Sequence, residues 1–563
     1  IITSDWSSDV CSSDLLENLV NPDSNDVHQL RPHYENSHKG VQYIGLDGNG
    51  DYAPPVRLAD PIAIIGRGRD DSGQHYRLIE WRRDGKTCRD ALPMADIGTP
   101  ACWARLQGHG ITIHAGRRKR ELLADYLQGE GSRDNWHITA RAGWHEGAYI
   151  LPSGEVLGGD HIHYHGDTSQ AAYYRERGSL EEWKAHIARY ANGNSRLTLA
   201  IGCALAAPLL RLLDINGGGF HLYGDSSCGK TTAAKVALSV WGNPDELTLT
   251  WEGTSHGFSN TAAARNDGLL VLDEIGQARP HVVAQTAYSV INGIGKIQGH
   301  KDGGNRAIMK WRVLLLSTGE KTMEGFAGQW EAGQATRLPS IPADAGKKLG
   351  IYDTLHDQAT GQELSEYLTD AASRYHGTAG RAFIARLMED TAHAKEAARE
   401  AMKGFYTGEL GGQAHRIAQH FAAVYAALTL ARPLLGIDPE PVRQCFHAWK
   451  ELEGTGNRES RIIIERAADF MQQNGTSPRF APWGATQTFP DLAGYRNGDE
   501  YWIIPPVFKA EICGTASNAE VRRVCETLHG IGWLKKAEDG RYPAKRYGRG
   551  RFYVLIGITP PED

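Results

Sequence analysis

The chain has 563 residues, of which 41% are hydrophobic and 23% charged, and a formal net charge of −6 at pH 7. This composition is typical of a soluble protein with several cores and excludes a disordered or fibrous chain. The weakly negative total charge excludes a globally basic nucleic-acid binder, so any surface that binds nucleic acid must be local. The eight cysteines show no CxxC or paired metal spacing, which favours the reducing cytoplasm over a disulfide framework.

The first 15 residues, IITSDWSSDVCSSDL, lack an initiating Met and repeat the unit SSD. We interpret them as a non-native, adapter-derived segment and expect the natural protein to extend further upstream. No secretory signal is visible. The longest apolar run, residues 197–213, contains Pro208 and Arg211 and is only as long as the shortest bilayer span, so it predicts a buried helix and no membrane association.

From about residue 41 to 158, short alternating segments such as YIGL and YRLIEWR are separated by Gly, Asp and Pro, which predicts a mainly β domain. Two roles remain open for it: a collar that grips DNA or assembles a ring, or a purely structural unit. His161, His163 and His165 alternate, so on a strand they share one face and three imidazoles can bind zinc. Because no further ligand pattern lies nearby, an exposed polar strand is the favoured interpretation.

The segment FHLYGDSSCGKTT, residues 220–232, fits the phosphate-binding pattern G-x-x-x-x-G-K-[ST] between an apolar strand and a helix predicted over 232–241. Its glycines let backbone N–H groups wrap phosphates, Lys230 reaches the β and γ phosphates, and the Thr231 hydroxyl ligates Mg²⁺. We expect Cys228 to be a small loop residue rather than a reactive thiol. The residues expected around ATP are Gly224, Asp225, Ser226, Ser227, Cys228, Gly229, Lys230, Thr231 and Thr232.

A second apolar strand, GLLVLDE over residues 268–274, ends in two acids. Asp273 is expected to help hold Mg²⁺ and Glu274 to polarise the attacking water, as in-line phosphoryl transfer requires. A third strand, RVLLLS over 312–317, ends in small polar residues that are suited to sense the γ phosphate. Ser317 and Thr318 are equal candidates.

Between these strands, residues 291–312 predict a hairpin whose turn is centred on residues 300–305. We expect it to reach DNA in a central pore through basic side chains: Lys296, His300, Lys301, Arg306 and Lys310. Arg337 in GQATRLP is the candidate arginine finger for a neighbouring subunit's γ phosphate. Arg416 is the candidate second sensor of the nucleotide.

Helical spacing from about residue 354 to 453 predicts a helical lid, and GTGNRES over 454–460 predicts a linker. Residues 518–534 then show helical periodicity and are followed by a basic, aromatic strand, which predicts a winged helix that contacts DNA phosphates. A protein-docking role for this domain stays open. Its basic residues are Lys535, Lys536, Arg541, Lys545, Arg546, Arg549 and Arg551.

Several motifs in this order, HLYGDSSCGKTT, TWEGTSHGFSNTAAARNDGLLVLDEIGQ, LLLSTGE and AGQATRLPSIP, together with the upstream RAGWHEGAYILPSGEVLG, resemble the domain-of-unknown-function 927 family (DUF927) of prophages and mobile elements. The likeness covers roughly residues 43–342. Members are similar to AAA+ replicative helicases of mobile elements, including those of staphylococcal cassette chromosomes, and some relatives carry an upstream primase-type domain. The resemblance implies a ring-forming, ATP-driven DNA helicase.

The expected fold class is therefore α/β: a P-loop AAA+ core with a parallel sheet, an N-terminal mainly β domain, a helical lid and a C-terminal winged helix. The expected parts are residues 1–15, 16–180, 181–350, 351–453 and 454–563. The expected function is ATP- and Mg²⁺-dependent movement on single-stranded or forked DNA by a homo-oligomeric ring, a hexamer, which a primase or polymerase of the same element joins. The alternatives are a switch or loader that remodels a protein partner, and a DNA-binding regulator whose assembly ATP supports.

Overall fold

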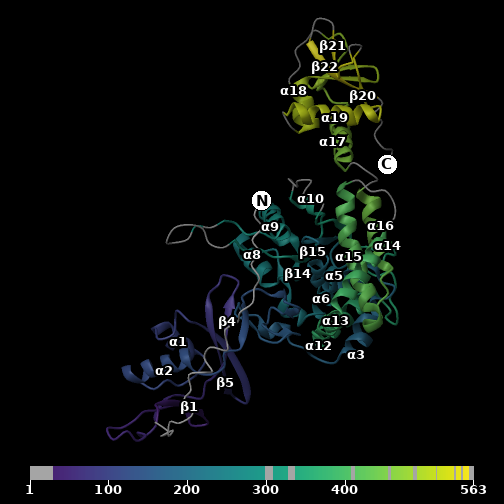
Figure 1. The fold of residues 1–563 in the computed structure, drawn as a ribbon. Coiled ribbons are helices and arrows are strands. Elements are labelled where there is room, and N and C mark those ends of the chain that lie inside the picture. Colours follow the sequence, from purple (N-terminus) through teal and green to yellow (C-terminus); the bar gives the residue numbers. More distant parts are fainter. Residues whose placement is uncertain are drawn as a thin grey trace, which may run out of the picture.

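The computed structural model describes residues 30–297, 299, 308–327, 337–406, 412–453, 458–485, 491–514, 517–537, 540–546 and 550–556. The 1–15 segment therefore lies outside the described residues. Figure 1 shows an N-terminal β-rich part, a central α/β part and a C-terminal part in chain order.

The N-terminal part contains two three-stranded sheets and one five-stranded sheet with the order β11-β7-β4-β5-β6. The small sheets are formed by β1 (His33–Ser37), β2 (Gly40–Ile44) and β3 (Val56–Ala59), and by β8 (Gly143–His145), β9 (Ala148–Ile150) and β10 (Val156–Leu157). The larger one contains β4 (Ala63–Asp70), β5 (His75–Arg83), β6 (Lys86–Pro93), β7 (Asn135–Thr139) and β11 (Ile162–Tyr164). Two helices, α1 (Pro100–Gly108) and α2 (Arg117–Gly129), cover one of its faces through a shared apolar core.

The central part is built on a parallel sheet with the order β13-β14-β15-β12-β16. Its strands are β12 (Gly218–Tyr223), β13 (Leu249–Thr250), β14 (Gly268–Asp273), β15 (Val313–Gly319) and β16 (Ser340–Pro342). The first strand in the chain therefore lies between the fourth and the fifth. The carboxyl ends of all five strands meet at one edge, where α/β folds bind their ligands.

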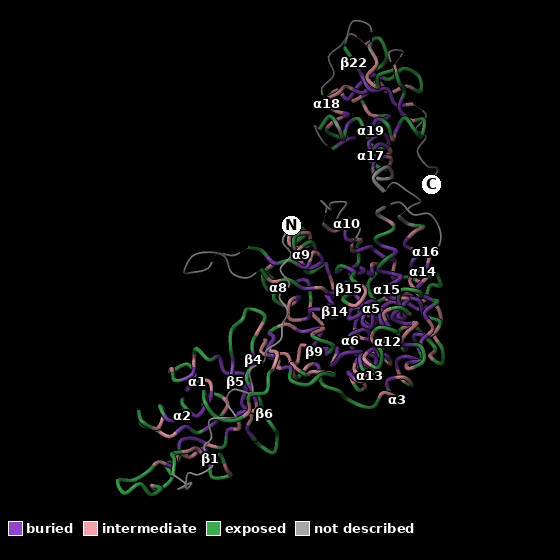
Figure 2. The backbone as a smooth tube through the Cα atoms, in the orientation of Figure 1, coloured by how far each residue is buried: buried purple, intermediate pink, exposed green. Residues whose placement is uncertain are grey.

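Alternate residues of the inner strands face two different cores, as burial on both faces requires. Leu314 and Leu316 of β15 pack with α5 (Ser195–Leu212) and α6 (Lys230–Ser239), whereas Val313 and Leu315 pack with α8 (Ser255–Ala264) and α9 (Pro280–Asn292). Figure 2 shows this region as the most deeply buried in the chain. The apolar runs of the sequence thus become central strands, as predicted.

Helix α5 is long and apolar enough to cross a bilayer by length and composition, but 89% of its apolar window is buried inside the fold. A helix that is apolar on all sides is buried from all sides, so α5 is a core helix, as predicted. Against it pack α15 (Gly412–Leu435) and α16 (Pro441–Glu453), and α12 (Gly361–Arg374) packs against α6. The helical segment also contains α13 (Thr378–Glu389) and α14 (Thr391–Phe405).

The C-terminal part begins with α17 (Arg458–Asn474) and combines helices with a six-stranded sheet of order β17-β18-β19-β22-β20, in which β21 pairs with β22. The strands are β17 (Phe480–Pro482), β18 (Gly494–Asn497), β19 (Glu500–Ile503), β20 (Leu534–Lys535), β21 (Pro543–Arg546) and β22 (Gly550–Ile556). The helix predicted over 518–534 is α19 (Asn518–Gly530). Strands β17, β18 and β19, which no sequence pattern predicted, enlarge the sheet beyond a two-stranded wing.

Candidate functional site

The phosphate loop connects the carboxyl end of β12 to the first residue of α6. Three of its residues have positive φ angles: Gly224 at 155°, Ser227 at 62° and Gly229 at 96°. These conformations turn the chain back on itself before the helix begins, so backbone N–H groups and the positive end of α6 face the enclosed space. The loop therefore has the backbone shape that an anionic phosphate requires.

The ammonium group of Lys230 lies inside this loop. It donates hydrogen bonds to the carbonyl oxygens of Gly224, at 2.8 Å, and Asp225, at 2.7 Å, and its Nζ lies 3.6 Å from the Cys228 sulfur. Lys230 is largely buried, and the loop carbonyls offset the cost of removing its charge from water. A phosphate in the loop would compete with these carbonyls for the same three N–H donors.

Residues from three elements meet beside Lys230. The Thr231 hydroxyl lies 3.0 Å from a carboxylate oxygen of Asp273, and the Thr318 hydroxyl donates a hydrogen bond to the other oxygen of the same carboxylate. Thr318 also accepts a 2.9 Å hydrogen bond from the backbone N–H of Glu274. The structure thus brings together four residues that the sequence analysis proposed separately.

A hydroxyl and a carboxylate are the hard oxygen ligands that Mg²⁺ prefers, so Thr231 and Asp273 fit the expected metal. Glu274 follows directly and has a left-handed backbone conformation, with φ of 53°. Its carboxylate accepts a hydrogen bond of 3.2 Å from the N–H of Gly276. A non-glycine residue in this conformation costs roughly 1–3 kcal/mol, and such strain clusters at functional sites.

Ser317 lies on the opposite side of β15 from these acids. It is fully buried, accepts a hydrogen bond of 3.0 Å from the Trp251 indole and lies 2.9 Å from Nδ1 of His221. His221 Nε2 lies 2.8 Å from the carbonyl oxygen of Lys321, so this nitrogen carries the proton and Nδ1 accepts from Ser317. Burial lowers the pKa of His221 to about 4, so the ring is neutral. Thr318 is therefore the candidate sensor that the structure places at the acids.

Arg337 lies at the other edge of the sheet. Its carbonyl accepts a 2.8 Å hydrogen bond from the N–H of Gly219, near the start of β12, and its guanidinium donates to Asn292 at the end of α9. About 16 Å of extended strand separates Gly219 from the phosphate loop, farther than an arginine side chain reaches. The Arg337 side chain therefore does not reach a nucleotide in the phosphate loop of its own subunit. Its predicted role as an arginine finger requires contact with the nucleotide of a neighbouring subunit.

Arg416 lies near the same edge. It is exposed and stands one helical turn before His420, whose ring lies 3.2 Å from the carbonyl oxygen of Asn216, just before β12. The structure does not bring Arg416 together with the phosphate loop of its own subunit. Its role as a second sensor stays a prediction, and this position restricts that role to contacts between subunits.

The predicted hairpin is described only at its base, where Ile294 and Lys310 form an antiparallel bridge. Lys296 is exposed there. His300, Lys301 and Arg306 lie outside the described residues. A cavity of about 720 Å³ beside the base is lined by Lys296, Asn292 and Arg337, among others.

One segment that contacts the phosphate loop was missed by the sequence analysis. The N–H of Ile351 donates a 2.9 Å hydrogen bond to the carbonyl of Cys228, and a Cβ at Gly229 would lie 2.9 Å from the Ile351 side chain. Tyr352 and Ser365 share a 2.6 Å hydrogen bond at the start of the helical segment. These contacts fix the loop's outer wall, and no nucleotide-binding motif marks residues 343–352 in the sequence.

The three alternating histidines do not share one site. His161 is exposed and lies edge-on to Trp136, whereas His163 and His165 gather near the buried Asp90. Their ligand atoms and that of Asp90 all lie within 4.8 Å of one another. However, Arg105 already donates two hydrogen bonds to Asp90, and this guanidinium opposes a cation there.

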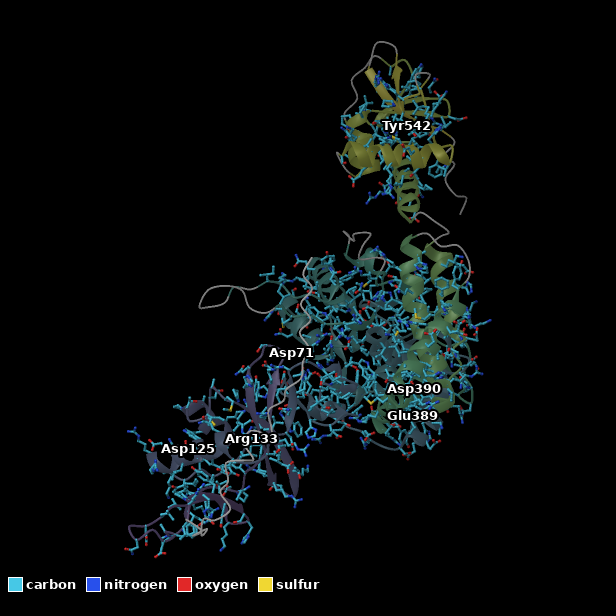
Figure 3. All side chains as sticks on the ribbon, in the orientation of Figure 1. Asp71, Asp125, Arg133, Glu389, Asp390 and Tyr542 are labelled. Atoms are coloured by element: carbon cyan, nitrogen blue, oxygen red, sulfur yellow. The ribbon has the colours of Figure 1, made fainter. Side chains whose placement is uncertain are left out.

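The basic residues of the C-terminal part lie around its last strands. Lys535, Lys536 and Arg551 are exposed, and Lys535 is paired with Glu500 at 2.8 Å. The side chains of Lys545 and Arg546, on β21, are not described, and Arg549 lies outside the described residues. In Figure 3, Tyr542 marks this part of the chain. Lys536 lies 5.3 Å from its ring centroid.

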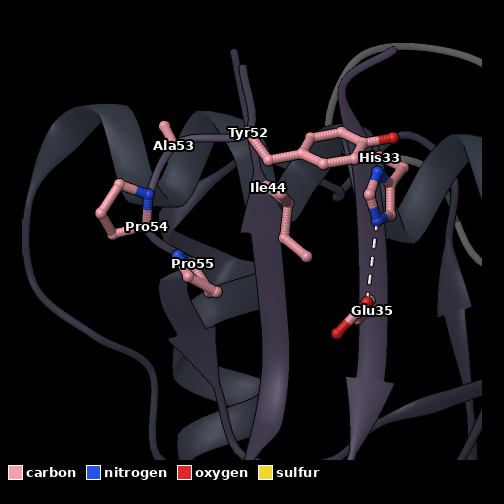
Figure 4. Close-up of a pocket in the computed structure, with 7 residues that line it drawn as sticks. All are labelled: His33, Glu35, Ile44, Tyr52, Ala53, Pro54 and Pro55. Atoms are coloured by element: carbon pink, nitrogen blue, oxygen red, sulfur yellow. Dashed lines mark ion pairs between the residues drawn. The ribbon is translucent and has the colours of Figure 1, made fainter. Parts of the chain in front are cut away.

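A cavity of about 430 Å³ in the N-terminal part lies beside β1 and β2 (Figure 4). Its polar lining residues, His33 and Glu35, are 3.7 Å apart, His33 half-buried and Glu35 exposed, and Pro54, Pro55 and Tyr52 form much of the rest. This lining brings no nucleophile or acid–base pair into a buried position, so the cavity adds nothing to the phosphate site.

A family model and solved structures match this chain. Residues 34–310 match the model of the family described as domain of unknown function (DUF927). A solved structure described as SCCmec type IV Cch, an active helicase, has a TM-score of 0.69 and 18% sequence identity over 93% of this chain and 97% of its own. The apo C-terminal region of NrS-1 covers 88% of this chain and 96% of its own at 10% identity, but with a TM-score of only 0.32.

A search of the curated proteins finds no match. The predicted family resemblance is therefore confirmed over residues 34–310, within which the phosphate loop and the acids Asp273 and Glu274 lie. Residues 34–310 therefore match the DUF927 model, and the fold of the chain is similar to that of a solved structure described as an active helicase.

Proposed function

We propose that this chain is an AAA+ ATPase that assembles as a ring, a hexamer, and moves on DNA during replication of a prophage or other mobile element. The observation that carries the proposal is the meeting of Lys230, Thr231, Asp273 and Thr318 at the carboxyl edge of a parallel sheet. The description of the similar structure as an active helicase supports it.

In the proposed reaction, the phosphate loop and Lys230 bind the phosphates of ATP. Thr231 and Asp273 would hold Mg²⁺, which would supply charge neutralisation for the transferred phosphoryl group. Glu274 orients and polarises water, and Thr318 fixes the position of both acids. Arg337 approaches the nucleotide of the adjacent subunit. Each residue thus has a role that its place in the fold permits.

Strand β15 offers a direct path from hydrolysis to movement. Thr318 at one end contacts both acids, and at the other end Arg312 follows the predicted hairpin. A shift at Thr318 when the γ phosphate leaves would be carried along this buried strand to the hairpin, about 20 Å away. Basic residues of the hairpin and of the C-terminal part would contact the DNA phosphates.

The test is steady-state ATP hydrolysis by residues 17–563, with and without single-stranded DNA, with Lys230→Ala as the blank. Strong stimulation by DNA that the variant lacks supports the motor and leads to an unwinding assay on forked DNA. A rate of ATP hydrolysis that DNA does not change, even at low salt, favours a switch or loader that acts on a protein. DNA binding that remains functional in a hydrolysis-deficient Glu274→Gln variant favours a regulator.

A further inference from the structure

Arg265, the residue that follows helix α8, is buried without an acidic partner. Only 2% of its surface is exposed, and it forms no ion pair in the described part of the chain. Its Nε donates a 3.2 Å hydrogen bond to the hydroxyl of Tyr174, and Nη2 donates one of 3.2 Å to the amide oxygen of Gln170. Both acceptors are uncharged, so neither balances the positive charge that burial removes from water.

Nη1 of the same guanidinium is buried and has no hydrogen-bond partner among the described residues, although it carries two N–H donors. A second buried arginine shows how the fold satisfies such a group elsewhere. Arg196 is 4% exposed, and all three of its nitrogens donate hydrogen bonds. The acceptors are the carbonyl oxygens of Pro342 and Asp344 and the hydroxyl of Ser195. A buried donor without a partner is rare in native proteins and marks a position where an ordered water or ion belongs.

A small cavity of about 20 Å³ lies beside Arg265 in the interior of the chain. Its walls come from the N-terminal part through Tyr149, from α6 and the residues after it through Leu238 and Trp241, and from β14 through Leu269. Figure 2 shows the backbone around β9, α6 and β14 as largely buried. A cavity of this volume holds one small guest, either a water molecule or a monatomic ion.

The polar groups around this cavity favour an anion. The Tyr174 hydroxyl accepts from Arg265, and its own proton has no acceptor among the described residues, so it is a second free donor. None of the residues that line the cavity is acidic. Asp267, two residues further along the chain, is not part of the lining, and its carboxylate accepts hydrogen bonds from the N–H of Trp144 and the amide of Asn266.

We propose that this cavity is a chloride site, in which the anion accepts hydrogen bonds from Nη1 of Arg265 and from the Tyr174 hydroxyl. A chloride ion balances the buried guanidinium and requires only donors, which are what these two side chains offer. A water molecule would satisfy Nη1 but leave the charge unbalanced, and the guanidinium excludes a cation. Sulfate and phosphate exceed a cavity of this volume. The assignment stands apart from the proposed function, since it involves neither ATP nor DNA.

The position of the site gives the anion a structural effect. Arg265 precedes β14, the strand that ends in the two acids, and Trp241 follows α6, the helix that begins with Lys230. On the N-terminal side, the hydroxyl of Tyr149 donates a 2.9 Å hydrogen bond to the carbonyl oxygen of Asp267. A bound chloride therefore joins the N-terminal part to the two elements that carry the phosphate site, and the stability of this junction should depend on it.

The first test is thermal unfolding of the full chain in sodium chloride and in sodium gluconate at equal sodium concentration. Chloride at about ten times its Kd should raise the melting temperature of the wild type by about 2 °C or more relative to the variant Arg265→Met, and the effect should saturate. In gluconate, Arg265→Met should be at least as stable as the wild type, because it removes a charge that has no partner. Arg196→Met, the matched control, should lower the melting temperature equally in both salts, because the donors that it removes are already paired. A chloride effect of the same size in the wild type and in Arg265→Met would overturn the site.

Tyr174→Phe tests the second donor and keeps the aromatic ring. It should raise the chloride concentration at half effect about tenfold, because one hydrogen bond to a charged group is lost. Crystals of the full chain grown in sodium bromide then locate the ion. With data collected at the bromine absorption edge, we expect an anomalous peak in the cavity within hydrogen-bond distance of Nη1 of Arg265. Ordinary density without an anomalous signal would identify a water molecule and refute the assignment.

Discussion

The hydroxyl of Thr318 donates a hydrogen bond to the carboxylate of Asp273 across two neighbouring strands of the central sheet. The same hydroxyl oxygen accepts from the N–H of Glu274, so one side chain fixes both acids. We expect Thr318→Val to lower kcat for ATP hydrolysis about a hundredfold, because a positioned polar group at the reacting phosphate is lost, while the affinity for ATP changes little. Steady-state kinetics and binding of a fluorescent ATP analogue separate the two quantities.

Thr318→Ser is the matched control for this prediction, since it keeps the hydroxyl and should retain most of the rate. Equal losses in the Ser and Val variants would mean that the methyl group, and hence packing, is what matters at this position. A large loss of ATP affinity in Thr318→Val would likewise contradict a role confined to the transition state.

Ser317 should respond differently. It is buried between His221 and Trp251, so Ser317→Ala leaves a ring nitrogen and an indole N–H without their partner. Each unpaired buried group costs about 1–3 kcal/mol, and we expect a lower melting temperature with only a modest change in kcat for the folded protein. Differential scanning fluorimetry beside the ATPase assay checks this. A catalytic defect without destabilisation would instead make Ser317 a sensor.

A pH dependence of stability follows from His221. Burial holds its pKa at about 4 in the folded chain, whereas an exposed histidine titrates near 6.5. Between these pH values the unfolded chain binds more protons than the folded chain. The free energy of unfolding therefore falls by up to about 3 kcal/mol as the pH is lowered from 6.5 to 4, and this histidine changes it no further below pH 4. The unfolding midpoint in urea should therefore fall more steeply with acid in the wild type than in His221→Gln. Parallel pH profiles of the two proteins would refute the assignment.

The site's chemistry was predictable because each motif is local in the sequence. Gly224 to Thr231 span one turn, and Asp273 and Glu274 end one apolar strand. The choice between Ser317 and Thr318 was not predictable, because neighbouring residues on a strand face opposite sides and only the sheet shows which side holds the acids. The contact of Ile351 with Cys228 was missed for a related reason, since it joins segments more than a hundred residues apart by backbone hydrogen bonds that leave no residue signature.

The curvature of the five-stranded N-terminal sheet is a further case, because the guanidinium carbon of Arg89, on β6, lies 5.7 Å from the ring centroid of Trp136, on β7. Short alternating segments predicted strands, but alternation does not predict that β6 and β7 curl towards each other, so the proximity of Arg89 and Trp136 had no sequence signal. The small strands β17 to β19 were missed because their short, mixed segments lack clear alternation.

Asn266 joins three parts of the chain at the start of β14. Its amide donates a 2.8 Å hydrogen bond to the carbonyl of Ala142 and accepts from the N–H of Arg312, and it is almost fully buried. Asn266→Ala leaves both backbone groups unpaired, so we expect a loss of roughly 2–4 kcal/mol in local stability and a looser N-terminal part. Limited proteolysis should then cut sooner between the N-terminal part and the core. A cleavage rate equal to that of the wild type would show that this residue does not hold the junction.

Arg337 should act between subunits. Arg337 lies at the sheet edge opposite the phosphate loop of its own subunit, so Arg337→Ala should not lower ATP binding to the isolated subunit. The variant should lower the rate of ATP hydrolysis by about 10³-fold or more, as the loss of an arginine finger does in other enzymes. Mixing Arg337→Ala with Lys230→Ala subunits should restore part of the activity. In such a mixture some interfaces pair the intact Lys230 of one subunit with the intact Arg337 of the next, whereas an arginine that served its own subunit would leave every site incomplete. If the mixture is no more active than the separate variants, Arg337 does not act as an arginine finger. Asn292→Ala, which removes only the hydrogen-bond partner of the Arg337 guanidinium, should lower the rate less than Arg337→Ala does.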